Sequence, residues 1–192
     1  GPKILIYQTH SQEALADSEP GNVSHTIVGA GDYLTKLLNE QYGIETIHHT
    51  GVYDMVDGAV DRSAAYERAL PDIEQILAEN PSIEVVIDLH RDGVGDHTRL
   101  VTEINGKQTA KIMFFNGMSR TRSNGDLTSM PNPYIQDNLA LSLQMQLASN
   151  ELYPGFTRHI YLQSYRYNMH LMPKDLLVDA GAQTHTVAEI HN

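Results

Sequence analysis

The side chains best suited to chemistry in this sequence follow segments that read as apolar β-strands. They are two histidines and two carboxylates: His10, Glu13, His90 and Asp179. The strands that precede or contain them are predicted over Ile4–Gln8, Ile83–Leu89 and Asp175–Asp179. Because ligands of open α/β sheets gather at the carboxyl ends of the strands, we expect these four side chains to lie together at one edge of a sheet.

Two histidines and one carboxylate form a donor set that suits catalytic zinc. Such zinc takes three nitrogen or oxygen ligands from the protein and keeps its fourth position for water, whose pKa it lowers to about 7. His10, Glu13 and His90 supply this set without cysteine, which the sequence lacks. Asp179 is placed to act as the general base. Asp88 can orient the His90 ring as a hydrogen-bond acceptor behind the metal.

His25 is an alternative third zinc ligand. It lies fifteen residues after His10, at the start of a predicted helix. The positive end of the helix dipole keeps an imidazole there neutral and able to bind a metal. We rank Glu13 ahead of it. The simpler interpretation is that His-x-x-Glu arises by chance and that His90 only caps a strand end. The run Asp-Leu-His-Arg-Asp after a central strand favours the metal site.

Two further clusters could bind substrate. Arg91 follows His90, and Arg166, Tyr167 and Asn168 precede the last strand. Arginine and asparagine at a strand-edge crevice can bind a carboxylate or stabilise an oxyanion. We therefore predict Arg166 and Asn168 as catalytic groups, and Arg91 and Tyr167 as substrate-binding groups. An ion pair of Arg91 with its neighbouring aspartate and a turn at Asn168 explain the same residues equally well.

The elements that must position these residues alternate between short strands and amphipathic helices. This is typical of an α/β domain with a mixed, mostly parallel sheet, here of about six strands flanked by helices. Helices are predicted over Ile27–Tyr42, over Asp61–Glu79 with a kink or a new start at Pro71, over Tyr134–Leu152 and from Thr186 onward. Further strands are predicted over Ile44–Ile47 and Arg158–Gln163, with a hairpin joining Thr98–Ile104 to Gln108–Phe115 at Asn105-Gly106 and a rim loop over Gly117–Pro133.

The length and the net charge of the chain limit its domain organisation and the classes of function that it can have. The 192 residues suit one domain. We assign residues 3–192 to a single catalytic domain, because Gly1-Pro2 resembles the scar of a cleaved tag. A net charge of −11 argues against binding to nucleic-acid backbones and to anionic lipid surfaces. No apolar run is long enough to span a bilayer.

Several motifs resemble, in order along nearly the whole chain, those of a known family. They are Thr9-His10-Ser11-x-Glu13, Val28-Gly29, Asp88-Leu89-His90-Arg91-Asp92, Tyr167-Asn168 and the segment Leu176–Gly181. The pattern resembles stage II sporulation protein P, a cell-wall hydrolase of spore-forming bacteria, and through it the zinc-dependent N-acetylmuramoyl-L-alanine amidases. The resemblance implies a phosphorylase/hydrolase-like α/β fold, shared with zinc carboxypeptidases. It also implies a Zn2+ enzyme that cleaves the amide between N-acetylmuramic acid and L-alanine of the peptidoglycan stem peptide, and stem-peptide cross-links as a further activity.

The resemblance also implies a setting and a set of roles. The protein would work in the cell envelope, outside the cytoplasmic membrane, held by an N-terminal anchor that this sequence lacks. Its partners would be stage II sporulation proteins D and M. By position, His10 and His90 match the metal histidines, Glu13 the acidic residue of the first motif and Asp179 the catalytic carboxylate. The family usually has glutamate in place of Asp179, and we expect a longer C-terminal helix than one that stops at Asn192.

Two other functions fit the same residues. A zinc carboxypeptidase-like peptidase also uses His-x-x-Glu, a distant histidine and a late carboxylate, and it needs an arginine for the terminal carboxylate, here Arg166 or Arg91. A catalytically weakened peptidoglycan-binding module would follow if Asp179 cannot replace the usual glutamate. A base misplaced by about 1 Å can lose about 100-fold in rate.

Overall fold

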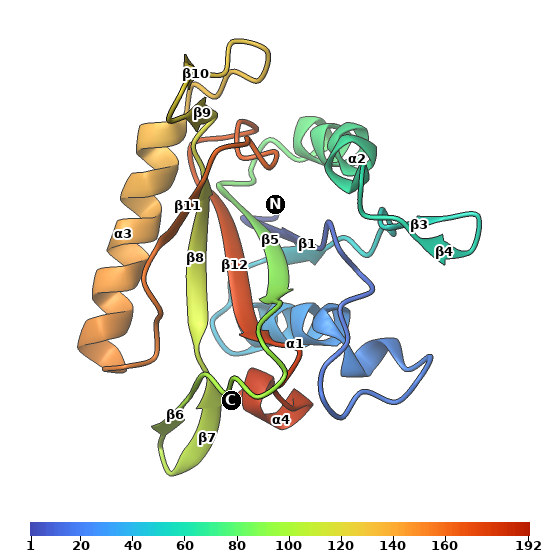
Figure 1. Ribbon diagram of the computed structural model, residues 1–192, viewed down its shortest axis with the longest axis vertical. Coiled ribbons are helices and arrows are strands. Elements are labelled where there is room, and N and C mark those ends of the chain that lie inside the picture. The colour runs from blue at the N-terminus through green and yellow to red at the C-terminus, as the bar shows by residue number, and fades with distance from the viewer.

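A six-stranded sheet forms the centre of the computed structural model, which describes all 192 residues (Figure 1). Its strand order is β11-β8-β12-β5-β1-β2. The strands are β1 (Ile4–Tyr7), β2 (Thr46–His48), β5 (Val85–Asp92), β8 (Ile112–Gly117), β11 (Tyr161–Gln163) and β12 (Asp175–Ala182). All neighbouring pairs are parallel except β12 with β8. The predicted fold class, a mostly parallel sheet of about six strands, is therefore confirmed.

Helices cover both faces of the sheet. They are η1 (Val23–His25), α1 (Ile27–Glu40), α2 (Ala65–Glu79), α3 (Ile135–Leu152) and α4 (Val187–His191). Leu5 of β1 packs in a cluster with Ile73 of α2, whereas its neighbour Ile6 packs with Ile27 of α1. Because successive side chains of a strand point to opposite faces, α1 and α2 lie on opposite sides of the sheet. On the α1 side, α1 and α3 line an apolar cavity of about 510 Å³.

Three short hairpins project from this core: β3 (Met55–Val56) with β4 (Ala59–Val60), β6 (Val101–Ile104) with β7 (Lys107–Ala110), and β9 (Arg120–Thr121) with β10 (Gly125–Asp126). The predicted turn at Asn105-Gly106 joins β6 to β7, and both turn residues have positive φ, as a two-residue hairpin turn requires. The predicted strand Gln108–Phe115 is wrong as one element. It divides at Lys111 because β7 pairs with β6, whereas β8 joins the central sheet.

Other element bounds also differ from the prediction. β5 continues to Asp92, so His90 lies within the strand and does not follow it. β12 likewise runs past Asp179. Both strands continue beyond their predicted ends because they pair with each other up to Asp92 and Ala182. The predicted rim loop contains the β9–β10 hairpin, and α2 runs without interruption through Pro71.

None of the four α-helices combines the length and the apolar character needed to cross a lipid bilayer.

Candidate metal centre and catalytic cavity

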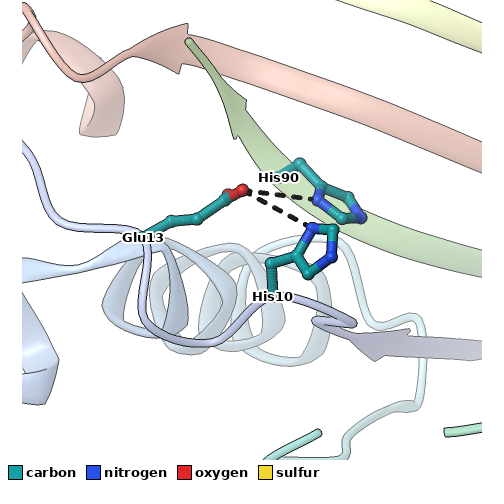
Figure 2. A group of neighbouring side chains, drawn as sticks. All are labelled: His10, Glu13 and His90. Atoms are coloured by element: carbon teal, nitrogen blue, oxygen red, sulfur yellow. Dashed lines mark ion pairs between the residues drawn. The ribbon is translucent and has the colours of Figure 1, made fainter. Parts of the chain in front are cut away.

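His10, Glu13 and His90 meet at the carboxyl ends of two neighbouring parallel strands. His10 and Glu13 follow β1, and His90 lies near the end of β5. One potential ligand atom from each residue lies within 4.8 Å of the other two (Figure 2). Oε1 of Glu13 is 3.8 Å from Nδ1 of His10 and 3.6 Å from Nδ1 of His90. The structure thus brings together the three residues predicted as metal ligands.

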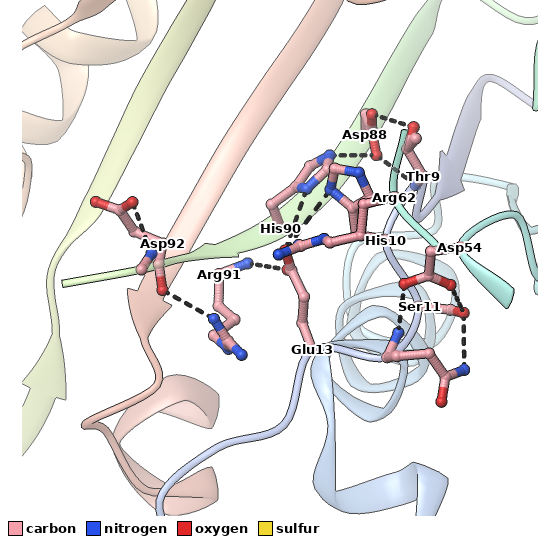
Figure 3. A network of polar contacts seen from close by, with 12 residues as sticks. Thr9, His10, Ser11, Glu13, Asp54, Arg62, Asp88, His90, Arg91 and Asp92 are labelled. Carbon is pink, nitrogen blue, oxygen red and sulfur yellow. Dashed lines mark hydrogen bonds and ion pairs between the residues drawn. The ribbon is translucent and has the colours of Figure 1, made fainter. Parts of the chain in front are cut away.

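The loop that carries His10 and Glu13 is fixed from two sides (Figure 3). Oε2 of Glu13 accepts a hydrogen bond of 2.7 Å from the backbone N–H of Arg91. On the other side, the buried carboxylate of Asp54 accepts hydrogen bonds from the Ser11 hydroxyl (2.8 Å) and from the backbone N–H of residue 12 (3.0 Å). These bonds hold the loop in the conformation that directs Glu13 at the two histidines.

Asp88 orients the second histidine. Its Oδ1 lies 2.8 Å from Nε2 of His90, which leaves Nδ1 of that ring directed at Glu13. The Asp88 carboxylate also accepts hydrogen bonds from the backbone N–H (2.9 Å) and the hydroxyl (2.6 Å) of Thr9. A carboxylate behind a ligating histidine fixes the ring orientation and increases its basicity as a ligand.

The two histidines have opposite electrostatic surroundings. Burial lowers the pKa of His10 to about 4, and the proximity of His90 and Arg62 adds to the decrease. Burial also lowers the pKa of His90, but the carboxylates of Asp88 and Glu13 raise it, and the net shift is well above the ordinary value. The first imidazole is therefore neutral near pH 7 and available as a ligand without losing a proton.

Asp179 is the fourth residue at this edge. It is the register partner of His90 in the pairing of β12 with β5. Its side chain is largely buried, and burial raises its pKa to about 7. A carboxylic acid with such a pKa can both accept and donate a proton near neutral pH.

A cavity of about 430 Å³ opens over these groups. Besides the cluster and Asp179, its walls include Arg62, Tyr66 and Tyr167. The ring of Tyr66 stands edge-on to His10 at 5.5 Å and to Tyr167 at 5.3 Å between centroids. The cavity is large enough to receive part of a substrate directly against the cluster.

The remaining predicted residues lie in different places. Tyr167 lines the cavity, and Arg91 borders it while its guanidinium donates to the carbonyls of Ala14 and of its neighbour Asp92. Arg166 donates to the Pro131 carbonyl and does not reach the cavity. The side chain of Asn168 is buried and donates to the Tyr66 carbonyl at 2.8 Å. Asn168 therefore ties its turn to α2 and is not among the residues that line the cavity.

His25 is also separate from the cluster. It belongs to η1 and lines a different cavity, with His191 of α4 and residues of α1. The alternative set in which His25 replaces Glu13 is therefore not assembled. The choice of Glu13 as the third member of the cluster agrees with the observed geometry.

Three residues of the site carry no signal in the sequence: Arg62, Tyr66 and Asp54. They come from the segment between β2 and the first turns of α2, which has no metal-ligand spacing and no catalytic motif. The role of Asp54 could not be predicted, because it depends on the position in space of the loop that this buried carboxylate holds.

The donor chemistry of the cluster fits a zinc ion. Two imidazole nitrogens and one carboxylate oxygen form one of the ligand sets of catalytic zinc. Bonds of about 2.0–2.1 Å in tetrahedral geometry place ligand atoms about 3.4 Å apart, and the observed separations of 3.6 and 3.8 Å are close to this value. The side of the cluster that faces the cavity leaves room for water and substrate.

Comparisons with known proteins agree with the motifs. The family model described as Stage II sporulation protein P (SpoIIP) matches residues 1–192. Stage II sporulation protein P of Bacillus subtilis (strain 168) is 20% identical over 201 residues. That alignment covers 97% of this chain and 47% of the relative, so the chain spans about half the length of that curated relative.

Two solved structures are similar in outline. An N-acetylmuramoyl-L-alanine amidase from Clostridium difficile 630 has 17% sequence identity and a TM-score of 0.47, over 100% of this chain and 87% of that chain. The catalytic domain of CwlV, an N-acetylmuramoyl-L-alanine amidase from Bacillus (Paenibacillus) polymyxa var. colistinus, has 10% identity and a TM-score of 0.43, over 92% of this chain and 79% of that chain.

Proposed function

Because this chain belongs to the stage II sporulation protein P family, we propose that it is a zinc-dependent peptidoglycan hydrolase. Its reaction is hydrolysis of the amide between N-acetylmuramic acid and the L-alanine of the stem peptide, with stem-peptide cross-links as a second class of substrate. The observation that carries the proposal is the assembly of His10, Glu13 and His90 beside Asp179 in one open cavity.

Different residues of the chain would bind the metal and transfer the proton during hydrolysis. His10, Glu13 and His90 would hold the zinc, which acts as a Lewis acid on the scissile carbonyl and makes water more acidic when it is bound. Asp179 accepts a proton from the attacking water as the new carbon–oxygen bond forms. It returns this proton to the alanine nitrogen as the carbon–nitrogen bond breaks. Its pKa of about 7 suits both transfers.

Other groups position the substrate and the metal ligands. Tyr66 and Tyr167 form an aromatic wall of the cavity, against which a sugar ring or a short peptide can pack. Arg62 is the arginine whose guanidinium lies nearest the cluster. Asn168 supports this wall from behind through its bond to the Tyr66 carbonyl, so we assign it a positioning role in place of the predicted catalytic one.

The proposed substrate also implies where the enzyme would work. Peptidoglycan lies outside the cytoplasmic membrane, so the hydrolase would work in the cell envelope. A membrane anchor and binding to stage II sporulation proteins D and M stay predictions of the family resemblance. The single catalytic domain over residues 3–192 stays a prediction from the length of the sequence and its first two residues.

The carboxypeptidase alternative needs a free arginine to bind a terminal carboxylate. Neither arginine predicted for this role is free: Arg166 bonds the Pro131 carbonyl, and the Arg91 guanidinium bonds two backbone carbonyls. Neither of the two arginines predicted for the peptidase is therefore placed for this role. Arg62 is another arginine of the cavity, so the reaction products must separate the peptidase from the amidase. The weakened binding module differs from the amidase only in the competence of Asp179.

Zinc content and product analysis test the proposal together. We would measure bound zinc and the products released from purified sacculi for the wild type, for His10→Ala and His90→Ala, and for His97→Ala as a control with an exposed histidine. We expect about one zinc per chain and release of stem peptides with a free alanine amine, both lost in the first two variants and kept in the third. Circular dichroism checks that each variant is folded.

Three other results would support an alternative function or contradict the metal centre. Zinc without products, together with binding to sacculi, would support the binding module. Release of single C-terminal residues from small peptides, with none from sacculi, would support the peptidase. A wild type without zinc would contradict the metal centre.

A further inference from the structure

Arg62 is bound to the oxygen that completes the metal-ligand cluster. It lies in the segment between β4 and α2, and its Nη2 donates a hydrogen bond of 2.6 Å to Oε1 of Glu13 (Figure 3). The same oxygen is the one that faces Nδ1 of both His10 and His90. No other side chain or backbone group accepts a hydrogen bond from the Arg62 guanidinium.

Burial explains why Glu13 needs a cation. Its side chain is only 4% exposed, and an ionised carboxylate in such a place is unfavourable unless it is paired. Its other oxygen, Oε2, receives only the backbone N–H of Arg91. Arg62 is therefore the cation that hydrogen-bonds the Glu13 carboxylate directly, whereas Nδ1 of His90 lies farther away, at 3.6 Å.

A metal ion in the cluster would supply the same positive charge at the same oxygen. A guanidinium within hydrogen-bond distance of Oε1 would then stand close to a divalent cation, and like charges at short distance repel. Arg62 is free to move away, because its side chain is 49% exposed and has no second partner. It borders the cavity of about 430 Å³, so a short displacement keeps it next to bound substrate.

We propose that Arg62 is a further functional residue of this site, with two positions that depend on the metal. This rests on the proposed metal centre. Without metal, Arg62 pairs with Glu13 and keeps the ligand loop ordered. When the metal binds, Arg62 leaves Oε1 and presents its guanidinium to an anionic oxygen of the substrate, a carboxylate of the stem peptide, which a planar five-donor group binds well.

Zinc affinity tests the first position. Arg62→Met keeps most of the side chain's length and removes its charge, whereas Arg62→Lys keeps the charge. Arg158→Met is the matched control, because Arg158 pairs with Asp92, another residue of the cavity wall, at 2.7 Å. In a competition titration with a chelator, we expect Arg62→Met to bind zinc about tenfold more tightly than the wild type, as loss of a charge-assisted hydrogen bond predicts. Arg62→Lys and Arg158→Met should stay within about threefold of the wild type, below the effect of one such bond.

Thermal unfolding tests the change of position. In the metal-free protein, Arg62→Met removes the cation that hydrogen-bonds the buried Glu13 carboxylate, so we expect a lower Tm than in the wild type. In the zinc-loaded protein this difference should disappear, because Arg62 no longer pairs with Glu13. A decrease in Tm that is equal in both forms would show that Arg62 stays on Glu13 and would overturn the proposal.

Kinetics test the second position. With zinc saturating, Arg62→Met should raise the KM for a soluble stem-peptide substrate that carries carboxylates and leave kcat within about threefold, because uniform binding is what the variant loses. An analogue with amidated carboxylates should show no difference between Arg62→Met and the wild type. An equal rise in KM for both substrates would contradict carboxylate binding.

The remaining outcomes distinguish a failure of the role proposed for Arg62 from a failure of the proposed metal centre. Unchanged or weaker zinc binding by Arg62→Met, with a wild type that binds zinc through His90, would overturn the role of Arg62 alone. Tighter binding by Arg158→Met to the same degree would attribute the effect to the net charge of the cavity and also overturn it. A wild type that binds no zinc would overturn both.

Discussion

His90 and Asp88 lie on the same strand, two residues apart, with Nε2 of the imidazole 2.8 Å from Oδ1 of the carboxylate. Side chains two residues apart on a strand point to the same face, so β5 alone brings this pair together. Thr9, which follows the adjacent strand β1, donates two hydrogen bonds to the same carboxylate. The pair therefore links the orientation of one proposed metal ligand to the segment that leads into the other two.

Asp88→Asn should weaken zinc binding by about 10–100-fold, the usual effect of losing a carboxylate behind a ligating histidine. The amide has a single acceptor oxygen, so it cannot accept both Thr9 bonds and also face the ring nitrogen. A chelator competition titration measures the change. Asp126→Asn is the control, because that aspartate forms only an exposed ion pair with Arg120. Equal zinc affinity of Asp88→Asn and the wild type would rule out an orienting role.

Asp179→Asn should lower kcat by about 10²–10⁴-fold, the range for loss of a general base, and leave one zinc per chain. The amide keeps the shape of the side chain but cannot take a proton from water. Product release from sacculi and zinc content are measured on the same samples. Asp179→Glu completes the series, because glutamate is the residue that the family resemblance predicts at this position. Hydrolysis by the glutamate variant alone would identify the natural chain as a binding module with a weakened base.

Much of the fold could be predicted from local pattern. α1 and α3 begin within one residue of their predicted starts, because apolar spacing and turn residues mark them. The ends of β5 and β12 could not be predicted in this way. β5 ends in the polar residues 90–92 and β12 in the small residues 180–182, neither of which has a strand pattern, and these ends become strand because they pair with neighbouring strands. Pro71 signals a break, but α2 absorbs it while packing Ala69 and Ile73 against the sheet.

Only those site residues that lie at the ends of adjacent strands could be predicted from the sequence. The sequence identifies His10, Glu13 and His90 because they lie at or just after the ends of adjacent parallel strands, and parallel strands end at the same edge. Arg62 and Asp54 reach the cluster from loops, and no sequence pattern determines where those loops lie. Arg166 is predicted in the site from its residue type and its place before the last strand, but its side chain bonds the Pro131 carbonyl, because successive residues of a tight turn point in different directions.

Gly117→Ala should disturb the turn that presents Tyr167. A Cβ at this position would lie 2.5 Å from the carbonyl oxygen of Tyr165 and 2.7 Å from that of Arg166. Tyr167 and the residue after it already have positive φ, 52° and 58°, so the turn has little freedom to adapt. We expect a loss of about 1–3 kcal/mol in the free energy of unfolding, as for other overpacked sites. We also expect a raised KM with zinc still bound.

Gly93→Ala is the control for stability, because no atom lies within 4 Å of its added Cβ and its φ is not positive. The wild type is the reference for KM, because Gly93 itself lines the cavity. Urea unfolding and steady-state kinetics of both variants provide the comparison. A Gly117→Ala protein as stable as Gly93→Ala and with an unchanged KM would show that the turn moves without consequence for the cavity.

Asp175→Asn should stabilise the protein increasingly as the pH rises. Asp175 is 1% exposed, and its Oδ2 forms no hydrogen bond. Burial raises its pKa well above the ordinary value, and the negative charge of Asp88 adds to the increase. In the unfolded chain the pKa of an aspartate is about 3.9. Above that pH the unfolded state loses the proton while the folded state keeps it, so the folded state binds more protons and the free energy of unfolding decreases as the pH rises towards the folded pKa.

Asparagine has no proton to lose, so the variant should lack this decrease. Urea unfolding of both proteins between about pH 4 and pH 8 measures it, the lower limit being set near the unfolded pKa. The difference in unfolding free energy between Asp175→Asn and the wild type should be smallest at the acid end and grow steadily towards neutral pH. Asp126→Asn, in an exposed ion pair, supplies the baseline. A difference that stays constant with pH would mean that Asp175 is ionised in the folded protein, and some group of opposite charge would then have to neutralise it inside the core.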